Sequence, residues 1–408
     1  SARSIINQCS EGCRDQGNYV TKGMAEVLAA YNCALIADMF GDAPCSQAAL
    51  IDENGSPVYL TPKMDKQEEI YTQAMQYLDD AIADLQKEDL IDPEAQDLLY
   101  QGDAEKWLKL AYGLKARYTM HLLKRSANKD ADMEKVLEYV NNSFESAEEQ
   151  AAFDVYDANN INPLYGFFVA RAGLGASESM RSKLAEYNDP RLSRAFITKQ
   201  GTSGKEQAPG TADNAVYAPN GTPEQGTSKY GTSLFMYSIS APTLLLSYHE
   251  LKFLEAEALC RLERDAKSAL KDAVVAGLLN AENSFTISRK ELGKTLINAA
   301  SSITEAEAES YFDNTIEAKY TAEPLKTTMT QKYFALWGAS GEATESYNDV
   351  RRMKGLGENF IELKNPNSFP LRCPYGNSDT TTNAEVKAAY GNGQYVYSEN
   401  VWWAGGSR

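Results

Sequence analysis

Side chains that commonly carry acid–base or metal chemistry are scarce in this sequence. It contains two histidines, His121 and His249, which lie far apart along the chain. A histidine-based zinc site or a Ser-His-Asp triad therefore has little material to form from. His121 falls on the apolar stripe of a predicted helix, so we expect a buried, hydrogen-bonded side chain there rather than a metal ligand.

Closely spaced carboxylates are poor candidates for catalysis. Glu255 and Glu257 stand two residues apart on a predicted helix, and side chains at this spacing point to different faces. They are therefore badly placed to face each other across a glycosidic bond, and we expect a solvated Glu255 or a salt-bridged Glu257. Asp154, Asp157 and Asn159 offer oxygens to calcium, but their spacing is not that of an EF-hand loop. We predict no metal site.

The cysteines leave more than one interpretation open. The sequence has six, of which four fall in the first 45 residues: Cys9, Cys13, Cys33, Cys45, Cys260 and Cys373. Cys9 and Cys13 lie one helical turn apart, but no second thiol pair or histidine is close, so zinc is a weak interpretation. Buried free thiols, or one or two disulfides, fit better, and the sequence does not choose between them.

Motifs for nucleotide binding and acyl transfer are incomplete. Gly391-Asn392-Gly393 begins like a dinucleotide loop, but Val396 stands at its third glycine position. Gly204-Lys205 lacks the Ser or Thr that must follow in a P-loop. Ser268-Ala269-Leu270-Lys271 matches a short acyl-enzyme pattern inside a predicted helix, without its companion motifs. We therefore predict no catalytic residue, no cofactor and a protein that is not an enzyme.

Aromatic side chains in a polar segment are the strongest candidates for binding. The sequence has 24 Tyr, and tyrosine joins a flat apolar face to a hydroxyl, which suits sugar binding. Residues 200–232 are rich in Gly and Pro, and a loop this long is usually functional or disordered. Rings in such a segment are buried or used, because exposed rings cost solubility. The predicted ligand site comprises Tyr217, Tyr230, Phe235 and Tyr237, with Asn220 as a polar partner.

These candidates differ in how easily the fold can bury them. Tyr217 and Tyr230 are flanked by Ala218-Pro219 and Gly231, and we expect them to be hard to bury. Phe235 and Tyr237 are equally suited to binding a ligand and to docking the loop onto the core. Trp402 and Trp403 form the runner-up pair, although a tail anchored by tryptophans is usually structural.

The elements that must position these residues are mainly helices. Apolar residues recur at spacings of three and four in stretches that we expect to be helical: 65–85, 104–125, 133–144, 177–187, 243–262, 266–279, 305–320 and 325–337. Asp103 is expected to cap the second of these helices. Short links between consecutive helices predict antiparallel hairpins stacked as in tetratricopeptide repeats, although the signature residues of that repeat are not clearly present.

The fold class follows from this pattern. We predict a mainly α protein in which tetratricopeptide-like helix hairpins form one lobe, with long irregular, loop-rich segments packed against it. Residues 1–408 are expected to form a single domain. Its helical frame is predicted at about 20–150 and 243–355, and its loop-rich segments at about 151–242 and 356–408.

Charge and hydropathy exclude several classes of partner. With 40 Lys and Arg against 57 Asp and Glu, the net charge is −17, which argues against nucleic acid and anionic membrane surfaces. Hydrophobic residues make up 43% of the chain, which is enough for a packed core. The longest apolar stretch, near Leu244-Leu245-Leu246, is too short to span a bilayer. No charged-then-apolar leader follows Ser1, so the protein is either cytosolic or has lost a leader.

Six segments carry a family resemblance by their order along the chain. They are Ala37-Asp38-Met39-Phe40-Gly41-Asp42-Ala43-Pro44, Ile70-Tyr71 with Ala81-Ile82-Ala83-Asp84-Leu85, Lys106-Trp107-Leu108-Lys109-Leu110-Ala111 with Leu114-Lys115-Ala116-Arg117, Phe253-Leu254-Glu255-Ala256-Glu257-Ala258, Gln331-Lys332-Tyr333-Phe334-Ala335-Leu336 with Glu345-Ser346-Tyr347-Asn348-Asp349-Val350-Arg351-Arg352, and Asn400-Val401-Trp402-Trp403. Together they resemble motifs of the SusD/RagB family of outer-membrane nutrient-binding lipoproteins from Bacteroidota, nearest to its shorter, SusD-like members. We expect Asp42, Trp107, Tyr347, Arg351 and Arg352 to hold the fold rather than a ligand.

The resemblance implies a function and a location. Proteins of this family capture a glycan, oligosaccharide or other nutrient such as a peptide at the cell surface, and deliver it to a SusC-like TonB-dependent transporter without catalysis. It implies a lipid anchor in the outer membrane, upstream of this chain, because Asn7-Gln8 before Cys9 is no lipobox. The family tends to build its site from loops between the two halves of the helical lobe, where the predicted aromatic residues lie. The alternatives are a glycoside hydrolase and a helical-repeat scaffold that binds peptides.

Overall fold

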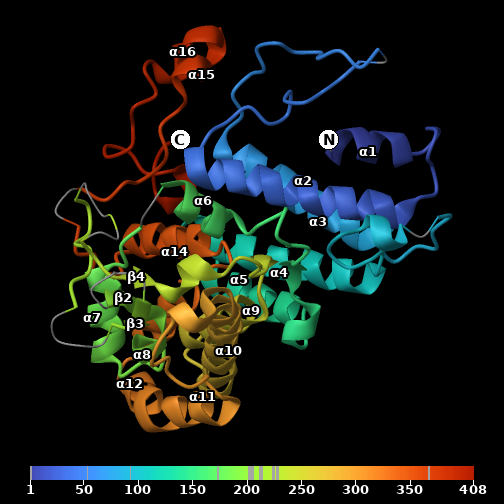
Figure 1. The fold of residues 1–408 in the computed structure, drawn as a ribbon. Helices are drawn as coiled ribbons and strands as arrows, with labels where there is room; N and C mark the ends of the chain where they lie inside the picture. The colour runs from blue at the N-terminus through green and yellow to red at the C-terminus, as the bar shows by residue number, and fades with distance from the viewer. Residues whose placement is uncertain are drawn as a thin grey trace. The chain divides into compact units, whose positions relative to one another are not determined.

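Helices dominate the chain, as the spacing of its apolar residues predicts (Figure 1). The structure is a computed structural model that describes residues 2–52, 54–91, 93–171, 174–200, 206–210, 215–222, 226, 229–365 and 368–408. The chain groups into two compact units. Unit 1 consists of Ser1–Glu145, Asn348–Asn359 and Ser368–Arg408, and unit 2 of Ser146–Tyr347 and Phe360–Asn367.

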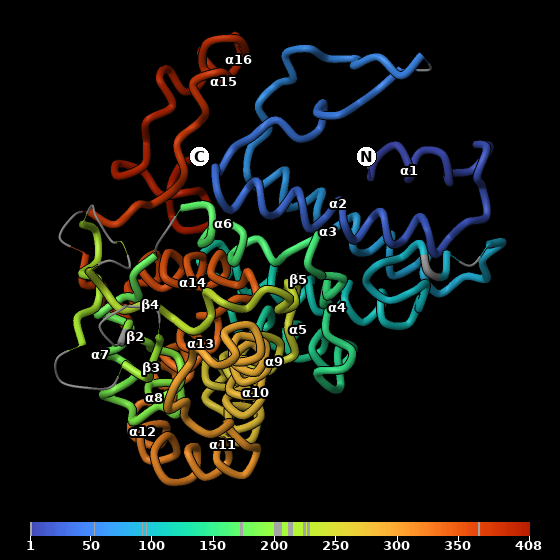
Figure 2. The backbone as a smooth tube through the Cα atoms, in the orientation of Figure 1, coloured from blue at the N-terminus to red at the C-terminus, as the bar shows by residue number. Residues whose placement is uncertain are grey.

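Unit 1 is built on helices that pair in chain order. Helix α2 (Tyr19–Phe40) packs against α3 (Gln67–Asp84), and α4 (Ala104–His121) packs against α5 (Lys129–Asn141); Figure 2 shows α2 and α3 side by side. Its other elements are α1 (Ala2–Cys9), η1 (Glu94–Gln96), η2 (Leu122–Arg125), α15 (Asn377–Thr382), α16 (Ala384–Tyr390), η7 (Trp402–Ala404) and the part of α14 (Ala343–Leu356) from residue 348 onward.

The sequence analysis did not identify α2 as a separate helix, nor the length and apolar composition of that helix. Among the described helices, α2 alone is long and apolar enough to cross a membrane by length and composition. The prediction that no apolar stretch is long enough for this is therefore wrong. Within the most apolar 18-residue stretch of α2, 50% of the stretch is buried. Glu26 and Asp38 in the same helix are 2% and 1% exposed. Lys22 Nζ lies 3.3 Å from Glu26 Oε1. Buried, partnered charges of this kind are typical of a core helix in a folded unit.

A polar cluster around Asp38 closes the core of unit 1. Asp38 Oδ1 accepts hydrogen bonds from the Tyr71 hydroxyl and, at 2.9 Å, from Trp403 Nε1. His121 Nδ1 lies 2.9 Å from the Tyr71 hydroxyl, and its ring stacks on Trp403 with centroids 5.7 Å apart. The Arg351 guanidinium also lies over the Trp403 ring, 4.9 Å from its centroid. The predictions of a buried, hydrogen-bonded His121 and a structural Trp403 are confirmed.

Asp42 plays a similar part at the start of α3. Its Oδ1 accepts the backbone N–H of Gln67 at 2.9 Å, and its Oδ2 accepts the Tyr390 hydroxyl at 2.5 Å and lies 2.9 Å from Lys66 Nζ. Trp107 is also buried, and its Nε1 donates to Asp97 Oδ2 at 2.7 Å. The residues of the family motifs in this unit therefore hold the fold, as expected.

Unit 2 combines helices with two small antiparallel sheets. Strand β1 (Ala151–Phe153) pairs with β5 (Thr243–Leu246), and β2 (Phe196–Gln200) lies between β3 (Glu206–Pro209) and β4 (Thr232–Ser233). Helix α9 (Tyr248–Arg261) packs against the long α10 (Lys267–Leu292), and α12 (Glu317–Ala322) packs against α13 (Pro324–Ala335). The remaining elements are η3 (Ala147–Glu149), α6 (Pro163–Arg171), α7 (Glu178–Glu186), α8 (Leu192–Ala195), η4 (Leu234–Tyr237), η5 (Gly293–Thr295), α11 (Glu305–Tyr311) and the π-helical turn η6 (Phe312–Ile316).

Most predicted helices are present, and the differences have local causes. Asp103 caps α4 as predicted, because its Oδ1 accepts the N–H groups of Glu105 at 3.1 Å and Lys106 at 3.2 Å. The predicted helix 243–262 is wrong at its start. Residues 243–246 form β5, which pairs with β1. Helix α9 begins only after that strand, where Ser247 caps it by accepting the Glu250 N–H with Oγ at 3.0 Å.

The predicted fold class, mainly α with tetratricopeptide-like hairpins, is confirmed. The loop-rich segment 200–232 contains β3 among its described residues, and residues 201–205, 211–214, 223–225, 227 and 228 of it lie outside them. The tail 369–408 is largely irregular, with α15, α16 and η7 as its helical turns. The organisation as a single domain stays a prediction.

Candidate functional site

Tyr217, the first of the predicted ligand contacts, is buried. It is 3% exposed, and its hydroxyl donates a hydrogen bond to the Gly210 carbonyl oxygen at 2.6 Å. Its ring meets Phe196 edge-on with centroids 5.2 Å apart, and the Arg181 guanidinium lies 5.4 Å from its centroid. Burial raises the pKa of Tyr217 to about 12. These contacts give Tyr217 a packing role.

Two glycines allow this burial. A Cβ at Gly210 would lie 1.7 Å from the Tyr217 hydroxyl oxygen, and one at Gly231 would lie 2.6 Å from Tyr217 Cε1. Real side chains do not approach this closely, so each glycine leaves the space that the ring occupies. The prediction that Tyr217 is hard to bury beside Gly231 is therefore wrong, because that glycine removes the atom that would block it.

Phe235 and Tyr237 dock their segment onto the core of unit 2. Phe235 is 2% exposed and lies between Phe285 and Trp337, at centroid distances of 4.7 and 5.1 Å. Tyr237 is half-buried, and its ring meets Phe168 edge-on at 5.2 Å. Of the two roles left open for these residues, the structure gives docking to both rings. Tyr237 still presents part of its side chain to solvent.

Tyr230 and Asn220 lie nearer the surface. Both are half-buried; Lys229 Nζ lies 5.0 Å from the Tyr230 ring centroid, and Asn220 Oδ1 accepts a hydrogen bond from Ser177 Oγ at 2.7 Å. The structure thus brings Tyr217 and Phe235 into one buried core. A ligand role for Tyr230, Tyr237 and Asn220 stays a prediction.

A pocket of about 440 Å³ lies in another part of unit 2, a volume within the usual range of small-molecule sites. It is bordered by the turn η3 and by helices α9, α10 and α11, so all of its walls belong to this unit. The residues that line it are Ala147, Gln150, Tyr248, His249, Lys271, Asp272, Val275, Ala276, Leu279, Asn280, Asn283, Glu305 and Glu309.

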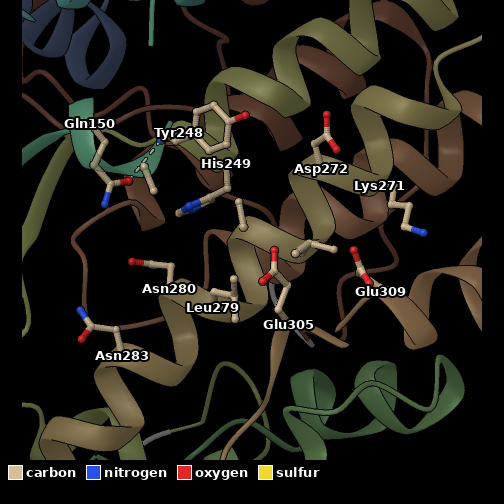
Figure 3. Close-up of a pocket in the computed structure, with 13 residues that line it drawn as sticks. Gln150, Tyr248, His249, Lys271, Asp272, Leu279, Asn280, Asn283, Glu305 and Glu309 are labelled. Atoms are coloured by element: carbon tan, nitrogen blue, oxygen red, sulfur yellow. Dashed lines mark hydrogen bonds between the residues drawn. The ribbon is translucent and has the colours of Figure 1, made fainter. Parts of the chain in front are cut away.

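Amide groups and one aromatic ring form one part of the pocket (Figure 3). Tyr248 is the first residue of α9 and is half-buried, and its backbone N–H donates to Gln150 Oε1 at 3.2 Å. Asn280 and Asn283 lie three residues apart on α10 and so share one helix face. Asn280 Nδ2 donates to Ser340 Oγ at 3.2 Å, which orients that amide.

Carboxylates form the opposite part of the pocket (Figure 3). Glu305 and Glu309 are exposed and lie one turn apart at the start of α11. Asp272 Oδ2 lies 3.6 Å from Lys252 Nζ, and Lys271 Nζ lies 2.8 Å from an oxygen of Asp313 outside the lining. The lysine charge is thus directed to another carboxylate, and the pocket keeps an acidic rim.

A buried histidine follows Tyr248 in α9. His249 is 1% exposed, and its Nε2 lies 3.2 Å from Glu342 Oε1. Burial raises the pKa of Tyr248, with Asp272 and Glu255 also raising it and Lys252 lowering it, so its hydroxyl stays protonated at neutral pH. The pocket therefore offers an aromatic ring face, a phenol hydroxyl that can donate a hydrogen bond, amide groups that can donate and accept hydrogen bonds, and carboxylate acceptors. This set suits a neutral, hydroxyl-rich ligand.

Sequence reasoning missed this pocket because its residues come from four separated segments. Asn280 and Asn283 provide one usable signal, since they place two amides three residues apart, and so on one face of an amphipathic helix. The pairing of that face with Gln150 and Tyr248 depends on tertiary packing, which the spacing of residues along the chain does not encode.

The carboxylates considered for catalysis are engaged elsewhere. Glu257 is fully buried, with its Oε1 2.8 Å from Arg261 Nε, and Glu255 Oε2 lies 2.5 Å from Lys252 Nζ. The prediction of a salt-bridged Glu257 is confirmed, and Glu255 also has a cationic partner. Asp157 Oδ1 accepts the N–H groups of Asn159 and Asn160, both at 2.7 Å, so it closes its own turn. In the part of the chain that the structure describes, no group of three or more His, Cys, Asp and Glu is placed to hold a metal.

Comparison with known proteins defines the class of the chain. A sequence model of the SusD-like family, described as "Starch-binding associating with outer membrane", matches residues 3–375. The chain therefore belongs to the SusD-like family. A comparison with curated proteins found no match.

Solved structures agree with this assignment. A SusD/RagB family protein from Bacteroides thetaiotaomicron is 67% identical, with a TM-score of 0.94 over 100% of this chain and 85% of that one. A chitin-binding SusD homolog from Flavobacterium johnsoniae shares the fold at 20% identity and a TM-score of 0.68, over 99% of this chain and 83% of that one. A SusD homolog from Bacteroides fragilis does so at 19% identity and a TM-score of 0.73, over 99% and 87%.

Proposed function

We propose that this protein binds a glycan or oligosaccharide at the cell surface and delivers it uncleaved to a TonB-dependent transporter of the outer membrane. The observation that carries the proposal is the family match over residues 3–375, since that family is described as starch-binding and associated with the outer membrane. A relative of the same fold is described as chitin-binding. Starch and chitin are both chains of pyranose rings, so a glycan is the ligand class that fits both descriptions.

The pocket of unit 2 is the proposed glycan contact. The ring of Tyr248 would pack against the apolar face of a sugar, while Gln150, Asn280 and Asn283 exchange hydrogen bonds with its hydroxyls. Each such hydrogen bond contributes only about 1 kcal/mol net, because water already satisfies the same groups. Selectivity would therefore come from the arrangement of several weak contacts.

Residues predicted from the sequence as ligand contacts provide a second proposed contact surface. Tyr230, Tyr237 and Asn220 are half-buried, and each keeps surface that a longer glycan chain can touch. Tyr217 and Phe235 support this segment from the core and are not proposed to touch ligand.

Binding without cleavage is supported by how the closely spaced pair Glu255 and Glu257 is used. Glu255 and Glu257 are held by Lys252 and Arg261. A hydrolase needs two carboxyl groups aimed at one bond, and this pair is occupied by cations instead. The proposed location is the outer face of the outer membrane, with a lipid anchor upstream of this chain. The net charge of −17 would keep such a protein soluble and away from anionic surfaces.

Calorimetric titration with malto-oligosaccharides and chito-oligosaccharides tests the proposal. We expect saturable binding of one class by the wild-type chain, with no change in the length of the sugar when the mixture is analysed by mass spectrometry. Shortened sugars would instead indicate a glycoside hydrolase. Binding of peptides in place of sugars would indicate a peptide-binding scaffold.

Delivery to a transporter needs a separate measurement. The full-length, lipidated protein is expected to fractionate with the outer membrane and to co-purify with a TonB-dependent transporter after mild detergent extraction. Recovery in the cytosolic fraction would contradict both the location and the partner.

A further inference from the structure

Two cysteines of unit 1 are held with their sulfur atoms in contact. Cys33 lies within α2, Cys45 lies in the segment that follows that helix, and their Sγ atoms are 3.3 Å apart. Both are free thiols in the structure. An S–S bond measures about 2.05 Å, so the two sulfurs need to approach by only about 1.2 Å to form one.

The Cys45 segment is fixed from two sides. The Arg3 guanidinium donates from Nη1 to the carbonyl oxygens of Cys45 and Ala48, both at 2.7 Å. On the other side, Asp65 Oδ2 accepts the backbone N–H groups of Cys45 at 2.9 Å and Ser46 at 2.6 Å. Cys33 belongs to a helix, so neither sulfur depends on a freely moving segment for its position.

The surroundings divide the two thiols into a nucleophile and a resolving partner. The hydrogen bond shared with the Cys33 thiol, together with the Arg3 guanidinium whose Nη2 lies 3.8 Å from Cys45 Sγ, lowers the pKa of the Cys45 thiol. The same hydrogen bond, with burial, raises the pKa of Cys33. Cys45 is therefore the thiol that ionises first.

A small reagent has a place to bind beside these sulfurs. Cys33 and Cys45 both line an apolar cavity of about 210 Å³, together with side chains that include Ala29, Ile36 and Ile70. Cys33 is half-buried, whereas Cys45 is 8% exposed. The cavity therefore leaves open space beside both sulfur atoms.

We propose that Cys33 and Cys45 form a thiol–disulfide exchange site that reacts with low-molecular-weight disulfides and closes to a Cys33–Cys45 disulfide. The Cys45 thiolate attacks one sulfur of a disulfide R–S–S–R, forms a mixed disulfide and releases R–S⁻. The Cys33 thiol then gives its proton to solvent and attacks the Cys45 sulfur, which expels the second R–S⁻. Two protein thiols are oxidised, and one small disulfide is reduced to two thiols.

Closure has a structural consequence for the start of the chain. A Cys33–Cys45 bond joins α2 covalently to the segment that Arg3 of α1 binds through its carbonyls. The bond restricts the unfolded chain more than the folded one, so oxidation stabilises unit 1.

Oxidised glutathione is the probe that tests this proposal. The native wild-type chain is incubated with it, the remaining thiols are alkylated after denaturation, and peptides are mapped by mass spectrometry. We expect a linked Cys33–Cys45 peptide, alkylation of the other four cysteines, and a melting temperature several degrees above that of the reduced protein. Independent alkylation of Cys33 and Cys45 after this treatment would overturn the proposal.

Single variants separate the two steps. Cys33→Ser lacks the resolving thiol, so we expect it to retain one glutathione on Cys45. Cys45→Ser lacks the nucleophile, so Cys33 should react at least tenfold more slowly. Cys260→Ser is the matched control, because Cys260 is also half-buried and its loss should leave the linked peptide unchanged. Equal glutathionylation of Cys33→Ser and Cys45→Ser would contradict the assigned roles. Should a variant fail to fold, the wild-type peptide map still decides the proposal.

Discussion

The segment from Tyr217 to Tyr237 and the pocket beside Tyr248 show opposite relations between composition and use. The first is rich in aromatic residues, yet Tyr217 and Phe235 are almost fully buried. The second has a single aromatic ring in its lining, yet its amides and carboxylates face a cavity of about 440 Å³. An aromatic residue in a loop thus says little about binding until its neighbours are known. Polar residues on a helix that packs tightly elsewhere are the more informative observation.

The two regions differ in whether side chains fill the available space. In the aromatic segment, Gly210 and Gly231 provide the space into which Tyr217 fits. Around the pocket, α9 and α10 pack against each other, and Asn283 of α10 is exposed in the lining. Space is filled by a ring in the first region and remains open in the second.

The largest effect is expected from Tyr217→Ala. Removing a buried aromatic ring and its hydrogen bond to Gly210 should lower the free energy of unfolding by about 3–5 kcal/mol. Denaturant unfolding of the whole chain measures this. Tyr230→Ala is the matched control in the same segment, and it should change stability by less than about 0.5 kcal/mol because that ring is half-exposed. Equal losses in the two variants would contradict the contrast between them.

Alkaline pH should weaken the packing of Tyr217 in a predictable direction. Its pKa is raised to about 12, whereas an unfolded tyrosine titrates near 10. A raised pKa means that the stabilising contribution is complete below pH 10 and is lost as the pH rises to 12. The stability gap between the wild type and Tyr217→Phe, measured by unfolding at each pH, should therefore narrow across this window. A gap that stays constant from pH 9 to pH 12 would show that the hydroxyl does not titrate as a buried group.

Tyr248→Ala tests the pocket itself. Loss of the ring face should weaken glycan binding about tenfold, which corresponds to about 1.4 kcal/mol. The melting temperature should change little, because the ring is half-buried at the first turn of α9. Calorimetry with the glycan that the wild type binds gives the affinity. Tyr237→Ala is the comparison variant. If it weakens binding while Tyr248→Ala does not, the ligand site lies in the aromatic segment.

The smallest effect is expected from Asn283→Ala. Asn283 is an exposed amide in the lining, so its loss should reduce affinity about two- to threefold, as for one solvated hydrogen bond. Thr286→Ala provides a control on the exposed surface of the same helix, outside the lining. An unchanged affinity for Asn283→Ala, with a loss for Thr286→Ala, would move the contact along α10 and out of this pocket.

The frame of the protein could be predicted because its causes are local. The three-and-four spacing identifies α3, α4 and the first half of α10, which continues to Leu292, and the Asp103 cap marks the start of α4 within one residue. The same reasoning extended a helix over residues 243–246, because Leu244, Leu245 and Leu246 fit a helical stripe as well as a strand. Pairing with residues 151–153 decides between the two, and that partner lies almost a hundred residues away.

The site could be predicted only in part, for the same reason. Composition and the family resemblance cannot distinguish a ring held by Phe196 from one left at the surface. They therefore predict the same role for buried and half-buried members of one set: Tyr217, Tyr230, Phe235, Tyr237 and Asn220. The pocket depends on four segments meeting, the turn η3 with Gln150 and helices α9, α10 and α11, and no single stretch of sequence contains that information. Family motifs identify Asp38, Asp42 and Trp403, which turn out to hold the core.

The hydrogen bond between Asp38 and Trp403 also limits when the core of unit 1 can be completed during biosynthesis. The two residues are 365 positions apart, and at roughly 5–20 residues per second a ribosome takes about 20–70 s to add the second after the first. Throughout that time the nascent amino-terminal helices lack the tryptophan that completes their interior. A chain interrupted shortly before residue 400 would therefore have a defect at its beginning rather than at its end.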